Sequence, residues 1–248
     1  MRHTLSWSIG PLLALSLAAG AQAEELAVDL EIVLAVDVSG SVDAYEARQQ
    51  RDGYVAAIRD PAVIRAIGAN EHRRIAVAYV EWAGATYQRT VVEWTLIDGE
   101  ATALAFADQL EDAPIGRERW TSISGGIDYA MPMFEDNGFV GDRLVIDVSG
   151  DGTNNSGRPL DFSRAEALER GIVINGLPIL NDRPQPFDMP TPKEVQLDLY
   201  YERHVIGGPG SFMVTAQSFE DFRTAVLAKL IREIAAIDGP EVVTIAQR

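Results

Sequence analysis

The sequence contains no cysteine, and this absence excludes several kinds of chemistry at once. Disulfide bonds, thiolate metal sites, cysteine nucleophiles and a lipidated N-terminal cysteine all need a thiol. Histidine is also scarce, because only His72 and His204 lie beyond the first few residues. A lone histidine is more often a surface or structural group than a catalyst, so neither is a candidate for acid–base chemistry.

Long apolar runs are lacking after the N-terminal segment, and that segment is itself short. A basic start at residues 2–3 precedes an apolar stretch from Leu12 to Ala19 and a small-residue exit at residues 21–23, which is the layout of a secretory signal peptide. The stretch falls short of the roughly 20 residues that span a bilayer, which argues against a membrane anchor. We therefore predict a signal peptide over residues 1–23 with cleavage near Ala23. The remaining single domain, residues 24–248, is expected to be periplasmic or secreted, without membrane insertion of the mature chain.

Basic residues are outnumbered, at 21 against 37 acidic ones, and the net charge is −16. Such a charge repels phosphate backbones and anionic lipids, so we expect no nucleic acid as a partner. A cation is the ligand that the charge attracts. Acidity alone also serves to keep an exported protein in solution, and composition does not choose between these two explanations.

Segments of strand and helix type alternate along the chain. Residues 28–36 have the pattern of a strand whose later half is buried on both faces, and the capping-box spacing of Asp43 and Glu46 begins a helix directly after it. Residues 74–82 and 87–96 are joined by a link too short for a crossover helix, so we expect an antiparallel hairpin at a sheet edge. The alternation predicts a doubly wound α/β fold, Rossmann-like, with a mostly parallel central sheet of about six strands, one antiparallel edge strand and helices on both faces.

The second half of the chain is less completely predicted. Residues 144–148 and 172–179 have the composition of buried strands, and the spacing of Ser163 and Glu166 predicts a helix that begins between them. Residues 193–205 carry no pattern that assigns them an element.

Polar motifs follow two of the predicted strands. Asp37-Val38-Ser39-Gly40-Ser41 ends the first strand, and Ser149-Gly150-Asp151-Gly152 ends a later one. In an open α/β sheet, ligands bind beyond the carboxyl ends of the strands, so the two turns meet if these strands are neighbours. Carboxylates and hydroxyls that converge there suit a hard divalent cation, Mg²⁺ first, with Mn²⁺ or Ca²⁺ as alternatives. The simpler interpretation is that Ser41 or Asp43 only caps the following helix.

This arrangement resembles the von Willebrand factor A superfamily over nearly the whole chain after residue 23. The metal-ion-dependent adhesion site (MIDAS) of that superfamily has Asp-x-Ser-x-Ser after the first strand, a threonine in a later loop and Asp-Gly after the fourth strand. The resemblance implies that the cation is held directly by the hydroxyls, and directly or through water by the aspartates. The residues implied are Asp37, Ser39, Ser41, Thr121 and Asp151.

Several residues around this motif have more than one candidate role. Trp120 precedes Thr121 where many members have glycine, so Ser122 is an alternative ligand, and Trp120 is a candidate partner contact as well as a packing residue. Asp147 and Gly152 are candidates to support the ligands from behind, although Asp147 inside a strand alternatively serves the fold through hydrogen bonds. The stretch from His204 to Gly210 looks like that of a bacterial exported family described as a domain of unknown function.

These features favour an exported binding or adhesion module over an enzyme. A bound cation would keep one coordination position open for a carboxylate supplied by a partner protein or a ligand. The alternative is an exported metal-dependent hydrolase of phosphoesterase type, with Asp37 as nucleophile or ligand. Haloacid-dehalogenase-like phosphatases carry a second aspartate two residues later, where this chain has Ser39. A structural component without a bound ion is a third interpretation.

Overall fold

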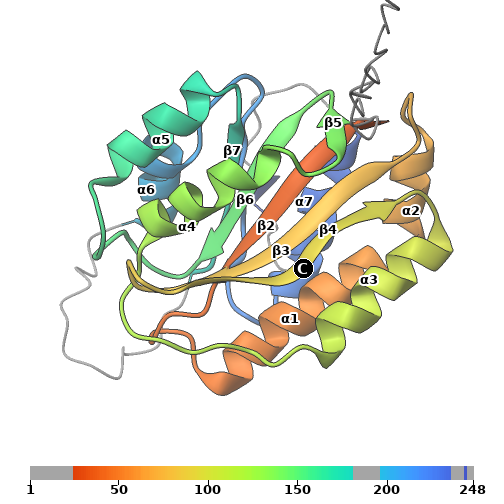
Figure 1. Cartoon of the computed structure of the whole chain (residues 1–248). Coiled ribbons are helices and arrows are strands. Elements are labelled where there is room, and N and C mark those ends of the chain that lie inside the picture. Colours follow the sequence, from red (N-terminus) through yellow and green to blue (C-terminus); the bar gives the residue numbers. More distant parts are fainter. Residues whose placement is uncertain (1–24, 181–195, 236–242, 245–248) are drawn as a thin grey trace, which may run out of the picture.

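A five-stranded sheet forms the centre of the computed structural model, which describes residues 25–180, 196–235 and 243–244. The strands follow in the order β4-β3-β2-β6-β7, and every neighbouring pair is parallel except β3 with β4 (Figure 1). Their bounds are β2 Leu30–Asp37, β3 Ile75–Trp82, β4 Gln88–Ile97, β6 Leu144–Gly150 and β7 Val173–Pro178. The mostly parallel sheet and its antiparallel edge hairpin are thus confirmed, and the first long strand, β2, lies at the centre of the sheet. The predicted signal peptide lies outside the described residues.

Two further pairs of short strands form small two-stranded sheets of their own. β7 makes parallel bridges to the segment after residue 212, pairing Gly176 with Met213 and Ile179 with Ala216. This segment contains β8 Val214–Thr215, a strand of only two residues. The short strands pair in parallel as β1 Leu26–Val28 with β5 Phe139–Gly141, and β8 Val214–Thr215 with β9 Val243–Thr244.

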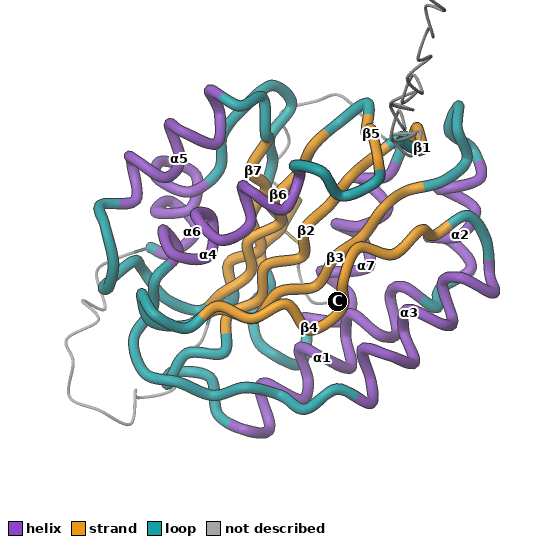
Figure 2. Tube along the Cα trace, in the orientation of Figure 1, coloured by secondary structure: helices purple, strands orange, loops and turns teal. Residues whose placement is uncertain are grey.

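Helices cover both faces of the sheet, as predicted (Figures 1 and 2). One face carries α1 Ala44–Ile58, α2 Pro61–Gly68, α3 Glu100–Asp112 and α7 Phe222–Ile234. The other face carries α4 Ile123–Ala130 with the 3₁₀ turn Met131–Phe134, α5 Leu160–Glu169, and α6 Leu197–Tyr200 continued by the π-helix Tyr201–Val205.

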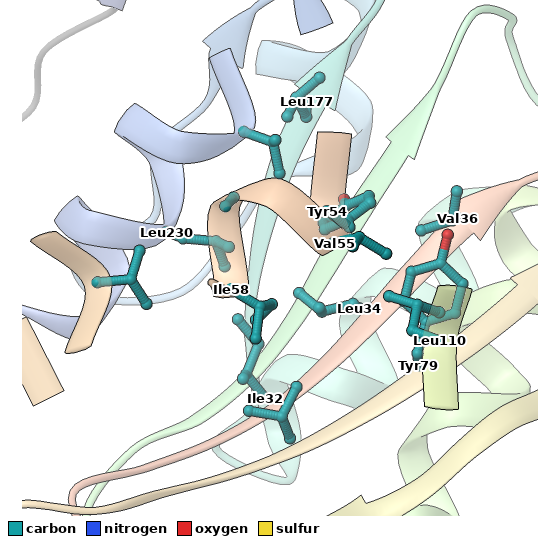
Figure 3. Packing of buried hydrophobic residues seen from close by; sticks show 14 of the residues in the cluster. Ile32, Leu34, Val36, Tyr54, Val55, Ile58, Tyr79, Leu110, Leu177 and Leu230 are labelled. Carbon is teal, nitrogen blue, oxygen red and sulfur yellow. The ribbon is translucent and has the colours of Figure 1, made fainter. Parts of the chain in front are cut away.

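The central strand shows why the sheet is buried on both sides. Successive side chains of a strand point to opposite faces, so a fully apolar run needs cover on each. Ile32, Leu34 and Val36 join the cluster beneath α1 and α7, which Figure 3 shows from close by. Val33 and Ala35 join the cluster beneath α4 and α5.

Helix starts were predicted with mixed success. Asp43 caps α1 by accepting hydrogen bonds from the N–H groups of Tyr45 and Glu46, and the Glu46 carboxylate accepts the Asp43 N–H over 2.8 Å, so the predicted capping box is present. The prediction at Ser163 was wrong, because α5 begins at Leu160. The Ser163 hydroxyl instead accepts a hydrogen bond from the Arg158 side chain.

A buried ionic cluster attaches α7 to the sheet. The Lys229 ammonium, fully buried, lies 2.6 Å from Asp147 Oδ1 of β6 and also contacts Glu233 Oε1 one turn along α7. Asn175 of β7 donates a further hydrogen bond to Glu233. Two carboxylates share one ammonium group here, and burial together with the charge of Asp147 raises the pKa of Glu233 to about 7.

The raised pKa of Glu233 predicts a specific dependence of stability on pH. The folded state keeps the proton up to about pH 7, whereas the unfolded state releases it near the ordinary value of 4.5. The contribution of Glu233 to the free energy of unfolding should therefore decline between these two pH values. In Glu233→Gln this contribution no longer depends on pH. The free energy of unfolding of the variant, relative to that of the wild type, should therefore rise by on the order of 1–3 kcal/mol between the two pH values.

Urea denaturation at several pH values measures this difference. Glu166→Gln serves as the control, because the arginines 158 and 170 lower the pKa of Glu166 in the folded state, so no folded-state titration of Glu166 occurs between the two pH values. Unfolding free energies of wild type and Glu233→Gln that run parallel with pH would contradict the assignment.

Candidate metal site

Two neighbouring strands end at the same edge of the sheet and carry the candidate residues. β2 and β6 pair in parallel, and their register places Val36 opposite Ser149. Asp37 is the last residue of β2, and Asp151 directly follows the last residue of β6. The two polar motifs of the sequence therefore meet at this edge, as neighbouring strands require.

The side chains implied by the resemblance form one connected cluster. Ser39 and Ser41 bring their hydroxyl oxygens within 3.1 Å of each other. Ser41 Oγ donates to Asp151 Oδ1 over 2.6 Å, and Thr121 Oγ1 donates to Ser39 Oγ over 3.3 Å. Asp37 Oδ1 accepts the backbone N–H of Ser39 over 2.7 Å, which folds the turn after β2. The structure thus brings all five residues together from three separate segments: the end of β2 with the turn after it, the loop before α4 and the turn after β6.

In the loop before α4, the hydroxyl groups of Thr121 and Ser122 point in different directions. Ser122 Oγ accepts the Gly125 N–H as the cap of α4, whereas Thr121 bonds to Ser39 in the cluster. Trp120 has a φ of +68°, in the left-handed region that glycine adopts most readily. The backbone at Trp120 thus adopts a conformation that glycine reaches more easily, and Thr121 keeps its place in the cluster.

Two asparagines that the sequence reasoning missed connect this loop to the one after β6. Asn155 Oδ1 accepts the N–H of Thr121 over 2.8 Å, and the Asn155 N–H in turn donates to the Thr121 carbonyl. Asn154 Oδ1 accepts the N–H of Ser124 at the start of α4. The sequence Asp-Gly-Thr-Asn-Asn offers a signal for this role in retrospect, because asparagine commonly bonds nearby backbone in loops.

The electrostatics of the cluster centre on Asp37. This carboxyl group is fully buried, and burial raises its pKa well above the ordinary value, with the neighbouring charge of Asp151 adding to the effect. Hydrogen bonds from Ser39 act in the opposite direction. Asp37 Oδ2 is buried and has no hydrogen-bond partner among the described residues. A buried carboxylate oxygen in this condition is costly, and a cation beside it would remove the cost.

The remaining candidates differ in their relation to the cluster. A Cβ at Gly150 would lie 2.9 Å from Asp37 Oδ2, so this glycine is required by close approach. A Cβ at Gly152 would lie at the ordinary contact distance of 3.5 Å from Thr121 Oγ1, so space alone does not require glycine there. Asp147 contacts Lys229, as described above. Of the two roles considered for Asp147, this contact corresponds to the role in the fold and not to support of the metal ligands.

Tyr201 is a neighbour of the cluster, and the sequence did not indicate it as a site residue. It begins the π-helix in the stretch to which no element was assigned, and its side chain is fully buried. Burial, followed by the charges of Asp37 and Asp151, raises the pKa of its hydroxyl well above the ordinary value. The tyrosine hydroxyl is therefore neutral and able to donate a hydrogen bond.

A second group of potential ligands lies at the opposite edge of the sheet. Asp29, His72 and Asp142 each precede a strand, and their candidate ligand atoms lie within 4.8 Å of one another. The Asp29 carboxylate already accepts the backbone N–H groups of His72 and Arg74, and His72 Nε2 lies 3.4 Å from Asp142 Oδ2. These contacts join the amino ends of the strands, and this group shares no residue with the cluster around Asp37.

Comparison with solved structures defines the class of fold as von Willebrand factor A-like. PTMP1 from the mussel byssus aligns over 86% of this chain and 50% of its own, with 16% identity and a TM-score of 0.61. The pilus adhesin SpaC from Lactobacillus rhamnosus GG aligns over 85% and 30%, with 14% identity and a TM-score of 0.58. A von Willebrand factor type A protein from Catenulispora acidiphila aligns over 84% and 42%, with 13% identity and a TM-score of 0.51. Another structure of PTMP1 is described as having a zinc-occupied MIDAS motif.

The chain belongs to the family described as "Protein of unknown function (DUF1194)", whose model matches residues 27–238. No curated protein matches the sequence. The chain spans half the length of PTMP1 and less than a third of SpaC, so the similarity concerns one part of those proteins. Within the described residues, no helix has the length and apolar character needed to cross a bilayer.

The burial of Asp37 predicts that Asp37→Asn stabilises the metal-free protein. The substitution keeps an acceptor for the Ser39 N–H and replaces a carboxyl group whose ionised form is disfavoured by burial and by the charge of Asp151. We expect the free energy of unfolding at neutral pH, with chelator present, to rise by about 1 kcal/mol. Asp43→Asn is the matched control, since asparagine caps helices as well as aspartate does and should change little. A loss of stability in Asp37→Asn beyond that of the control would contradict this account.

Proposed function

We propose that this protein is a metal-dependent binding module that recognises a carboxylate of a partner protein or ligand through a divalent cation. Ser39, Ser41 and Thr121 supply hydroxyl oxygens, and Asp37 and Asp151 supply carboxylates, directly or through water. Mg²⁺ is the cation we favour, with Mn²⁺ or Ca²⁺ as alternatives, because all of these ligands are hard oxygen atoms.

One observation carries the proposal: Asp37 Oδ2 is buried and has no hydrogen-bond partner among the described residues. The same carboxylate accepts the Ser39 N–H, and the Ser39 hydroxyl contacts those of Ser41 and Thr121. A buried carboxylate in a stable protein is normally paired with a base or a metal. The groups that shift the pKa of Asp37 are Asp151 and Ser39, and neither is a base. The zinc-occupied motif of PTMP1 supports the same assignment by analogy of fold.

The surroundings of the cluster suit an acidic partner. The loop containing Arg117 and Trp120 crosses the turn after β2, where the Glu118 N–H donates to the Val38 carbonyl. Arg117 is exposed, and Trp120 is 52% exposed although it directly precedes Thr121. Exposed arginine and tryptophan are frequent anchors of protein interfaces, and positive charge near the site offsets the repulsion of an acidic partner by a chain of net charge −16.

Export belongs to the same proposal. We infer that residues 1–23 act as a signal peptide and that residues 24–248 work in the periplasm or outside the cell. The hydrolase alternative needs an acid or base near the reacting atoms. His72 lies with Asp29 and Asp142 at the opposite edge of the sheet, and His204 is an exposed residue that contacts Asp161. The binding module is therefore the function we favour.

Calorimetric titration of the metal-stripped protein with Mg²⁺, Mn²⁺ and Ca²⁺ tests the metal site. We expect one ion per chain, with binding abolished in Asp37→Ala and in Asp151→Ala because each removes a carboxylate from the ligand set. Asp142→Ala is the matched control, since it removes a carboxylate at the opposite edge of the sheet and should leave the affinity unchanged. Binding that is lost in Asp142→Ala and retained in Asp37→Ala would assign the ion to the other group and refute the proposal.

Binding to immobilised acidic peptides tests the recognition of a carboxylate. Peptides that contain Asp or Glu should bind only in the presence of Mg²⁺ or Mn²⁺, and their Asn or Gln counterparts should not bind. Trp120→Ala should weaken peptide binding by about tenfold or more without changing metal affinity. Metal-dependent turnover of phosphate or carboxylic esters that is lost in Asp37→Ala would favour the hydrolase instead.

A further inference from the structure

Tyr201 presents an unexplained buried polar group. Its side chain is fully buried, and its hydroxyl has no hydrogen-bond partner among the described residues. Native proteins satisfy nearly all such groups, so each exception calls for a specific explanation. The residue also begins a π-helix, a rare conformation that occurs frequently at functional sites.

Two glycines on neighbouring strands make room for the tyrosine ring. A Cβ at Gly176 of β7 would lie 2.9 Å from Cδ1 of Tyr201, and a Cβ at Gly150 of β6 would lie 3.0 Å from the Tyr201 hydroxyl oxygen. Both distances are shorter than ordinary van der Waals contact. Any larger residue at either position would displace the tyrosine. The two glycines thus form a slot that admits the side chain from the layer of α5 and α6 to the carboxyl end of β6.

The slot ends beside the candidate metal site. The same Cβ position at Gly150 lies 2.9 Å from Asp37 Oδ2, so the Tyr201 hydroxyl and this carboxylate oxygen border one small volume. Both atoms are buried, and neither has a hydrogen-bond partner among the residues described. One atom is a donor and the other an acceptor, which makes them complementary.

We propose that the Tyr201 hydroxyl donates a hydrogen bond to Asp37 Oδ2, directly or through one water, when a cation occupies the site. The inference rests on the proposed metal site and adds a positioning residue to it. Bound metal keeps Asp37 ionised, and a hydrogen bond to an ionised acceptor is stronger than one to a neutral acceptor. The bond fixes the orientation of the carboxylate, as groups behind metal ligands commonly do. It also connects the segment Leu197–Val205 to the ion.

Tyr201→Phe tests this role because it keeps the ring and removes only the hydroxyl. We expect the dissociation constant for Mn²⁺, measured on the metal-stripped full chain, to rise about tenfold. The metal-free variant should unfold at the same or a higher urea concentration than wild type, because the removed hydroxyl has no partner to lose. A purely structural role predicts the reverse, with lower metal-free stability and unchanged Mn²⁺ affinity.

Tyr129→Phe provides the matched control. Its hydroxyl lies 3.0 Å from Thr90 Oγ1, between α4 and β4, and takes no part in the cluster. This variant should bind Mn²⁺ as wild type does. Wild-type affinity in Tyr201→Phe would overturn the role of Tyr201 and leave the metal site standing, whereas absence of Mn²⁺ binding by the wild type would overturn both.

Discussion

The parallel pairing of β2 with β6 is the constraint on which the rest of the structure depends. It places the carboxyl ends of two buried strands side by side, with Val36 opposite Ser149, and thereby brings Asp37 and Asp151 into one cluster. Two acidic groups of one chain repel each other, so this arrangement carries a cost that hydrophobic burial elsewhere has to offset. Both faces of β2 are covered by helices, and the apolar clusters on each side supply that stabilisation.

The two buried aspartates on these strands have different neighbours. Asp147 of β6 receives the ammonium group of Lys229, which the chain itself provides from α7. Asp37 of β2 lies next to hydroxyl groups and another carboxylate, and its Oδ2 atom and the hydroxyl of Tyr201 border a common volume. Under the proposed function, a cation from outside the chain neutralises Asp37.

The sequence predicted the features that depend on local pattern. Three local patterns are each compatible with only one structure, and each prediction was confirmed: the apolar run of β2, the short link between β3 and β4, and the capping box at Asp43. The start of α5 was mispredicted because Ser163 bonds to an arginine instead of capping the helix. The roles of Asn155 and Tyr201 depend on contacts between segments distant in the chain. Tyr201 in particular reaches the site only because two glycines on other strands leave space for it, and no local pattern encodes such a slot.

The most direct test of the metal site is an anomalous difference map from crystals grown with Mn²⁺. We expect one peak at the carboxyl end of β2, within about 2.0–2.6 Å of the Ser39 and Ser41 hydroxyl oxygens. A peak beside Asp29, His72 and Asp142 with none near Ser39 would contradict it. A well-ordered structure with no peak at either edge of the sheet would also contradict it, and Asp37 would then be a buried acid held by hydrogen bonds alone.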